Sequence, residues 1–292
     1  TSSSAIFTSP SGIVRTRDEE IQNFANWFQY YRSRVLLARA GVGRAFARQG
    51  TNMRVGFAAI NKGSSTIDGV ASDGAMIQGV RPFLGGDRTV FFDNLYGHVI
   101  PQGWTPLRTA LDDVGKYFQR SDNSGPWSET PGTSNATTHL QCRQSYNILM
   151  TDGYWNRFSP GVGNSDNTDG TVISGPNEPD FQYIAAKAGE PYDDVYSNTL
   201  ADVGMHYWKR DLRTNLSNEV PKNSADDAFW QHMVTFTVGL GVTGTLDPDT
   251  DLPDLKNGNL SWPDATTSDE TRIDDLWHAS LNSRGGFFSA SN

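Results

Sequence analysis

A short apolar segment near the middle of the chain, Tyr146 to Met150, runs directly into Thr151, Asp152 and Gly153. A carboxylate that follows a buried parallel strand lies at the sheet edge where open α/β proteins bind their ligands. A glycine at the next position permits a tight turn of the backbone. The segment therefore favours an α/β fold and marks Asp152, with Gly153 beside it, as a candidate ligand-binding site.

Apolar strand patterns alternate with amphipathic helix patterns along most of the chain. Strands are expected at Met53 to Ile60, Tyr146 to Met150 and Met233 to Leu240, with edge strands at Thr89 to Phe92 and Phe287 to Ala290. Helices are expected at Glu19 to Arg48, Leu107 to Phe118, Ser197 to Leu212 and Arg272 to Leu281. This order predicts an α/β, doubly wound, mostly parallel sheet, with helices covering both faces of its apolar strands.

The 292 residues suffice for one large domain with a sizeable core. Residues 1–18 are rich in Ser and Thr without periodicity and are expected to form an extended lead-in. Residues 19–292 are expected to form a single domain with long polar insertions at 61–100, 154–196 and 243–269.

The charge pattern excludes two classes of partner. The net charge is −9, and Lys and Arg do not cluster, so neither a nucleic-acid surface nor an anionic membrane surface is expected. The longest apolar run, Met233 to Val242, is far below the roughly 20 residues of a membrane span. Cys142 is the single cysteine, which excludes an internal disulfide and favours a small buried apolar residue just before the strand.

A second polar turn, Gly103 to Pro106, precedes the Leu107 to Phe118 helix and places Thr105 at the expected N-cap. Thr105 and Asp152 would share one cation if the start of this helix and the end of the Tyr146 strand converge. Each residue alone is commonly structural, because hydroxyl N-caps and turn aspartates need no ligand.

Other polar groups give weaker signals. The acidic segment Asp247 to Asp254 lacks the Gly and the distal Glu of an EF-hand and is expected to be a solvated loop. The five histidines have no zinc-type spacing. Neither a nucleophile elbow nor a phosphate-binding loop occurs, so an enzyme is not expected.

The order of helices and strands, with the Met-Thr-Asp-Gly strand end, resembles a von Willebrand factor type A domain. Three stretches, Glu20 to Arg34, Cys142 to Asn156 and Asp274 to Ala290, are similar to the amino-terminal half of the PilY/PilC type IV pilus tip adhesins. The resemblance covers roughly Asp18 to Ala290.

The resemblance implies an extracellular domain at the pilus tip or bacterial cell surface that serves pilus biogenesis, adhesion and twitching motility. The implied partners are minor pilins or other pilus tip proteins, and a host or matrix ligand. It also implies a metal-ion-dependent adhesion site for Mg²⁺ or Ca²⁺, in which Thr105 matches the second element and Asp152 the third. Trp104 stands where small residues usually precede the Thr, either as an apolar rim of the site together with Gly153 or as a packing residue.

The first element of that site, an Asp-x-Ser-x-Ser loop, is absent from this sequence, and Ser2, Ser3 and Ser4 do not replace it. One carboxylate and one hydroxyl hold Mg²⁺ poorly, so weak metal binding is expected. The implied central strand is also absent. A strand from polypeptide upstream of Thr1, or from another chain, is expected between the Met53 and Tyr146 strands.

Two alternatives remain open. One is a metal-dependent hydrolase that uses Asp152 with a histidine such as His98. The other is a purely structural plug of the pilus tip without a ligand of its own.

Overall fold

The computed structural model describes residues 5–72, 74–101 and 103–290. Contacts divide the chain into two compact units, Thr1–Gly50 and Thr51–Asn292. The sequence pattern instead predicts a boundary after residue 18, because the helical pattern that follows continues without a break toward the first strand of the main domain. The first helix of that pattern buries none of its residues, which explains why it groups with the first unit.

The first unit starts with a hairpin of β1 (Ala5–Thr8) and β2 (Val14–Thr16), paired antiparallel. Its turn is closed by Ser9, whose Oγ accepts a hydrogen bond from the Ile13 N–H at 2.9 Å. The extended lead-in expected for residues 1–18 is therefore wrong where the structure describes it, and Ser2, Ser3 and Ser4 lie outside the described residues.

The single helix expected at Glu19 to Arg48 is instead two helices, α1 (Arg17–Tyr30) and α2 (Arg34–Ala47). Ser33 interrupts the apolar pattern, because its extended backbone and its side chain, which accepts from the Leu36 N–H, start a new helix. A helical period continues through such a break in sequence, so periodicity alone did not show it.

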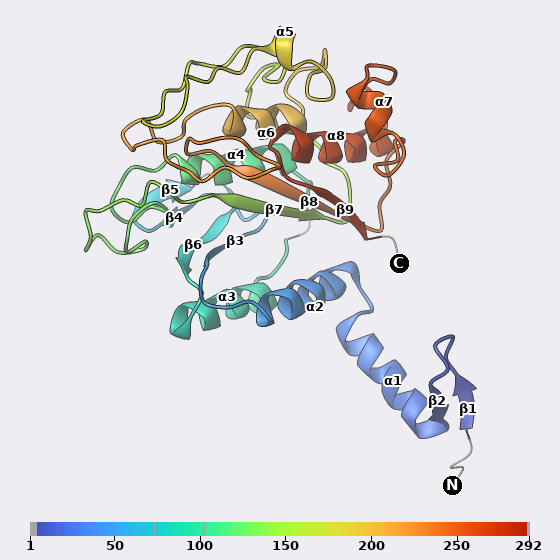
Figure 1. Cartoon of the computed structure of the whole chain (residues 1–292). Helices are drawn as coiled ribbons and strands as arrows, with labels where there is room; N and C mark the ends of the chain where they lie inside the picture. Colours follow the sequence, from blue (N-terminus) through green and yellow to red (C-terminus); the bar gives the residue numbers. More distant parts are fainter. Residues whose placement is uncertain (1–4, 73, 102, 291–292) are drawn as a thin grey trace. The chain divides into compact units, whose positions relative to one another are not determined.

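A parallel three-stranded sheet lies in the second unit. It contains β7 (Tyr146–Thr151), β8 (Val234–Leu240) and β9 (Phe287–Ala290), in that order (Figure 1). Tyr146 is opposite Val234, and Thr237 is opposite Phe287. The expected parallel pairing of the Tyr146 and Met233 strands and the expected terminal edge strand are confirmed.

The expectation that the Met53 strand pairs in the same parallel sheet is wrong. This strand, β3 (Arg54–Ala58), pairs antiparallel with β6 (Met76–Pro82). The segment between them makes its own hairpin of β4 (Ser65–Ile67) and β5 (Val70–Ser72). The connection therefore contains a hairpin, whereas parallel pairing needs a crossover, which is usually a helix. In the described ranges, no strand is hydrogen-bonded between β3 and β7.

Thr89 to Phe92, expected as an edge strand, belongs to helix α3 (Gly85–Gly97). Phe91 and Leu95, four residues apart, are its buried positions, and the Phe91 ring meets Phe83 edge-on at 5.4 Å. A run of β-branched and aromatic residues is typical of a strand. Here the residues that pack against the rest of the unit are four apart, which is the spacing of a helix.

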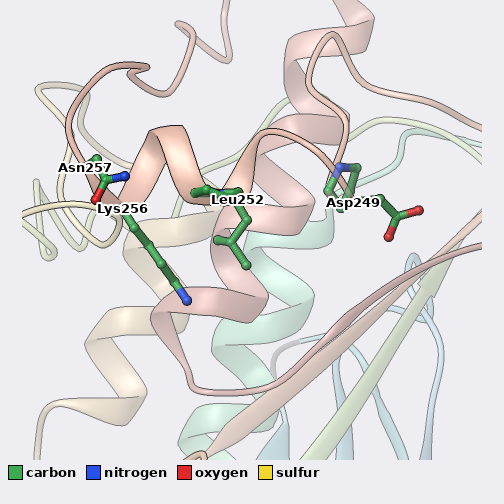
Figure 2. Close-up of a pocket in the computed structure, with 6 residues that line it drawn as sticks. Asp249, Leu252, Lys256 and Asn257 are labelled. Atoms are coloured by element: carbon green, nitrogen blue, oxygen red, sulfur yellow. The ribbon is translucent and has the colours of Figure 1, made fainter.

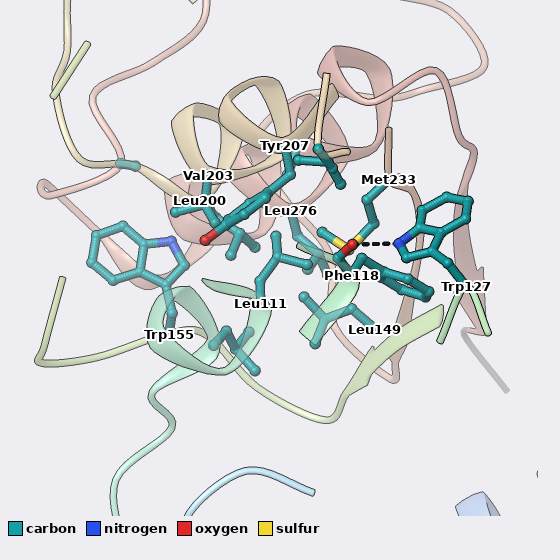
Figure 3. Close-up of a cluster of buried hydrophobic side chains, with 14 residues drawn as sticks. Leu111, Phe118, Trp127, Leu149, Trp155, Leu200, Val203, Tyr207, Met233 and Leu276 are labelled. Carbon is teal, nitrogen blue, oxygen red and sulfur yellow. Dashed lines mark hydrogen bonds between the residues drawn. The ribbon is translucent and has the colours of Figure 1, made fainter. Parts of the chain in front are cut away.

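Three helices cover one face of the parallel sheet: α4 (Leu107–Phe118), α6 (Leu200–Trp208) and α8 (Asp269–Asn282) (Figure 1). Between them lies a core that includes Leu111, Leu149, Val203, Tyr207 and Leu276 (Figure 3). Burial of such apolar surface is the main favourable term in folding.

Two short helices, α5 (Ala185–Ala188) and α7 (Leu252–Lys256), lie within the polar stretches 154–196 and 243–269. These stretches also supply buried residues, such as Tyr183 and Trp262. In the part of the chain that the structure describes, every helix is too short or too polar to cross a bilayer.

Candidate functional site

The two residues assigned to the implied metal site lie on loops that are tied together. Asp152 follows β7 and is exposed, and Thr105 precedes α4. Asn156, from the same loop as Asp152, accepts from the Thr105 N–H at 2.8 Å and donates its own N–H to the Thr105 carbonyl at 3.0 Å. The expectation that Thr105 is the N-cap of α4 is wrong. Pro106 takes that position and makes no side-chain capping bond.

A third loop, which follows β3, contacts the loop before α4. Asn61, just after β3, donates its side-chain N–H to the Trp104 carbonyl. The Trp104 side chain is 49% exposed, and the Arg157 guanidinium lies 3.7 Å above its ring. Loops that follow β3 and β7 therefore meet the loop before α4, with the Trp104 and Arg157 pair on the outside.

Gly153 has a different role from the one expected. The turn at this position is closed by Thr151, whose Oγ1 accepts from the Gly153 N–H and donates to the Gly153 carbonyl. A Cβ atom at Gly153 would meet nothing within 4 Å, so the turn does not require glycine on steric grounds.

The oxygen ligands that these loops offer are too few for Mg²⁺. Thr105 supplies one hydroxyl and Asp152 one carboxylate, while Asn156 Oδ1 is already occupied by the Thr105 N–H. Mg²⁺ requires near-octahedral coordination and Ca²⁺ takes six to eight oxygens. These residues alone do not fit either ion, and further oxygen ligands would have to come from elsewhere.

The residue named for a hydrolase, His98, is the C-cap of α3, and its ring packs near Phe57 at 6.4 Å. Cys142, expected to be buried, is exposed. It lines a shallow surface pocket with Glu219 and Pro221 rather than packing under the strand that it precedes.

In the acidic segment from Asp247 to Asp254, residues 247–251 form a loop, as expected, whereas Leu252 begins helix α7. Asp251 accepts from the Asp247 N–H, and Asp247 accepts from the Asp249 N–H, so these carboxylates serve their own turn. A pocket beside them is lined by Asp249, Leu252 and Lys256 among others, with Asp249 and Lys256 pointing in different directions (Figure 2). The pocket gathers no charged pair that would bind a ligand.

A buried cluster that the sequence did not predict combines Asp166, Asp194 and His278. One ligand-type atom from each of these residues lies within 4.8 Å of the others. Asp166 is 0% exposed and His278 is 1% exposed. The His278 ring stacks on Trp262, with the ring centres 4.2 Å apart.

The segment that carries Asp166 is fixed by polar contacts. Lys209, itself buried, donates to the carbonyls of Ser165 and Thr168, and the Tyr183 hydroxyl donates to the Asp166 carbonyl at 2.6 Å. These bonds hold the backbone on both sides of Asp166, and its carboxylate Oδ2 lies 3.8 Å from His278 Nε2.

The electrostatics of the cluster reflect burial. Burial raises the pKa of the Asp166 carboxyl, and the negative charges of Asp202 and Asp194 act in the same direction. Burial opposes protonation of His278, but hydrogen bonding to Asp194 and the charge of Asp166 raise the pKa of His278 overall. Burial lowers the pKa of Lys209 to about 8.

No sequence motif indicates this cluster, because Asp166 and His278 belong to distant segments, the polar stretch 154–196 and α8. The one available signal was the stretch Gly163 to Gly170, which is rich in Asn, Asp and Ser, but such composition also describes ordinary loops.

Comparison with known proteins identifies related sequences. The chain is 36% identical over 297 residues to the type IV pilus biogenesis factor PilY1 of Pseudomonas aeruginosa strain PAK, covering 93% of this chain and 24% of the relative. It is 36% identical to PilY1 of strain PAO1, over 94% of this chain and 25% of the relative. It is 33% identical to PilY1 of strain UCBPP-PA14, over 92% of this chain and 24% of the relative.

The chain is thus homologous to one part of PilY1. It spans about a quarter of the length of these curated relatives. No family model matches it, and no solved structure matches it.

Proposed function

We propose that the chain is a non-enzymatic binding and assembly domain of a type IV pilus biogenesis factor, located at the pilus tip or bacterial surface. The observation that carries this proposal is the similarity to PilY1 over 93% of the chain. Minor pilins or other tip proteins are the proposed partners in assembly. A host or matrix ligand is the proposed partner in adhesion and twitching motility.

The geometry supports the loops around Trp104, Thr105 and Asp152 as the binding surface. These loops are exposed, and hydrogen bonds of Asn61 and Asn156 hold them in one place. Functional residues commonly lie on loops that a rigid sheet positions. The half-exposed Trp104 under Arg157 offers an aromatic and cationic surface of the kind enriched at protein interfaces.

We propose a von Willebrand factor A-like fold, in which a parallel sheet under α4, α6 and α8 lies beside the antiparallel β3 and β6 pair. A strand from polypeptide outside these 292 residues, or from another chain, would pair between β3 and β7. That strand would also carry the oxygen ligands that Thr105 and Asp152 lack for Mg²⁺ or Ca²⁺.

The test is complementation in the native bacterium, with the gene deleted and then restored as parent, Trp104→Ala, Asp152→Ala or the control Asp249→Ala. Deletion is expected to remove surface pili, seen by electron microscopy, and twitching. Trp104→Ala and Asp152→Ala are expected to retain pili but reduce attachment to a surface. The control should behave as the parent.

The outcomes separate the alternatives. Normal pili and twitching in the deletion strain would contradict a role in biogenesis. Attachment that is unchanged by both Trp104→Ala and Asp152→Ala would favour a structural tip plug. Hydrolysis of an ester, peptide or glycan by the purified protein, lost in Asp152→Ala, would favour the hydrolase with His98.

A further inference from the structure

We propose that Asp166, Asp194 and His278 form a binding site for a divalent transition-metal ion of the zinc class. This site is separate from the exposed loops around Thr105 and Asp152, and its existence does not depend on the function proposed for them. Three features carry the inference: the arrangement of the ligand atoms, the orientation of the histidine, and the burial of an unpaired carboxylate oxygen.

Each carboxylate is fixed through one oxygen and leaves the other available. Asp194 Oδ1 accepts from the Tyr196 N–H at 2.7 Å, while Asp194 Oδ2 lies 3.5 Å from His278 Nδ1. Asp166 Oδ2 accepts from the Asn282 side chain at 2.9 Å, and Asp166 Oδ1 is buried without a hydrogen-bond partner among the described residues. Both side chains are thus oriented before any ion binds.

The histidine has the arrangement common to metal ligands. Its Nε2 lies 2.9 Å from the Tyr192 carbonyl and 3.8 Å from Asp166 Oδ2, which fits donation by an Nε2–H to Tyr192 and leaves a lone pair on Nδ1. Metal-binding histidines usually donate their other N–H to a carbonyl or carboxylate in this way.

The distance of 3.5 Å from His278 Nδ1 to Asp194 Oδ2 is longer than an ordinary N–H···O bond. Two ligands of a tetrahedral Zn²⁺ with bonds of about 2.1 Å lie about 3.4 Å apart. The observed separation is therefore also that of two ligands of one ion.

Burial supplies the driving force. A buried carboxylate oxygen without a partner is costly, and a carboxylate in such a place is normally paired or bound to a metal.

The donor types select the class of ion. Zn²⁺ accepts imidazole nitrogen together with carboxylate oxygen, whereas Mg²⁺ and Ca²⁺ prefer oxygen ligands alone. Three protein ligands would leave one position of a tetrahedral ion for water or another group.

The test is calorimetric titration of the chelator-treated chain with ZnCl₂, in a Cys142→Ser background because the exposed thiol could itself bind Zn²⁺. The background protein is expected to bind one Zn²⁺. Asp166→Asn and Asp194→Asn, which keep the side-chain shape, should each weaken binding at least tenfold. Asp249→Asn, on the exposed acidic loop, and Asp152→Asn should bind as the background protein does. Absence of Zn²⁺ binding, or equal binding by the two ligand variants, would overturn the proposal.

A second measurement does not depend on folding of the Asp166 variant. Long-range ¹H–¹⁵N NMR of the His278 ring should show, with ZnCl₂, a neutral ring that is protonated at Nε2 and metal-bound at Nδ1. A ring that remains protonated at both nitrogens in saturating Zn²⁺ would identify a buried ion pair and would refute the metal site. Loss of Zn²⁺ binding in Asp194→Asn with normal pilus assembly would leave the proposed function standing.

Discussion

Buried aspartates join segments of the second unit that are far apart in sequence. Asp275, on α8, accepts from the N–H groups of Leu200 and Ala201 at the start of α6 and from the Trp155 indole N–H. Asp113, on α4, accepts from the N–H groups of Ala75 and Met76 at the start of β6. The carboxylate in each case satisfies backbone donors that would otherwise be buried without partners.

Asp113→Asn is expected to lower the free energy of unfolding by about 2 kcal/mol. Both backbone N–H groups donate to the same oxygen, Asp113 Oδ2, and a neutral amide oxygen in its place accepts them less strongly than the carboxylate does. Urea unfolding followed by circular dichroism measures the change. Asp93→Asn, at an exposed position of α3, is the control and should alter stability by less than about 0.5 kcal/mol. Equal effects of the two variants would contradict the structural role of Asp113.

His206 is expected to make the folded chain less stable in mild acid. Burial lowers the pKa of His206 to about 4, and the nearby positive charge of Arg210 acts in the same direction. An unfolded histidine titrates near pH 6.5. Between pH 6.5 and 4 the unfolded chain therefore binds a proton that the folded chain does not, and stability falls as the pH falls through this window.

An NMR titration of the His206 ring protons should give a midpoint well below pH 6. The Arg210 guanidinium lies 3.0 Å from His206 Nδ1. His206→Gln, which keeps an acceptor for Arg210, should show a smaller loss of stability between pH 7 and 4.5. A midpoint near 6.5 would show that the ring is protonated as easily in the folded chain as in water.

Helices α6 and α8 pack closely against each other at Gly204. A Cβ atom at Gly204 would lie 2.7 Å from the Ala279 carbonyl oxygen, a backbone atom that cannot move without its helix. The two helices therefore approach more closely than any larger residue would allow.

Gly204→Ala is expected to destabilise the chain by about 1–3 kcal/mol, since the added methyl must push the helices apart. Gly86→Ala, in α3, is the matched control. A Cβ atom there meets nothing within 4 Å, and alanine is the better helix former, so this variant should be neutral or slightly stabilising. Chemical denaturation measures the free energy of unfolding of both variants. Destabilisation of the same size in each would assign the effect to glycine loss in general.

The sequence predicted elements well where the local pattern and the packing agree. Both ends of α4 and the pairing of β7 with β8 were predicted, because these segments carry one strong apolar period and bury it. The apolar pattern predicted one helix in place of α1 and α2, because it does not register the N-cap at Ser33 that separates them. It failed again at β3, whose partner is set by the chain reversal that leads to β6.

The candidate sites divide in the same way. Thr105 and Asp152 could be named as candidates from the sequence because each stands next to an apolar element. Asp166 and His278 were not found, because their proximity depends on how a long polar stretch folds back over α8. No local period records such a contact.

At the scale of the whole molecule, the core clusters belong to the second unit. Their buried residues run from Ile67 in the smallest cluster to Ala279 in the largest. In contrast, α1 buries none of its residues, and Phe24, Trp27 and Phe28 on it are each about half exposed. Apolar burial, which provides most of the folding free energy, is therefore concentrated after Gly50.

A chain of residues 51–292 is accordingly expected to fold by itself. Its urea-unfolding transition should keep the midpoint and the steepness of the full-length transition, since the slope reports the surface exposed by the unit that unfolds. Tryptophan fluorescence follows this unit almost selectively, because only Trp27 of the eight tryptophans precedes residue 51. The Gly204→Ala variant should lower the midpoint equally in both lengths of chain, because the α6 and α8 contact lies within the second unit. A broad transition, or a large drop in midpoint on truncation, would mean that residues before 51 are needed to complete the core.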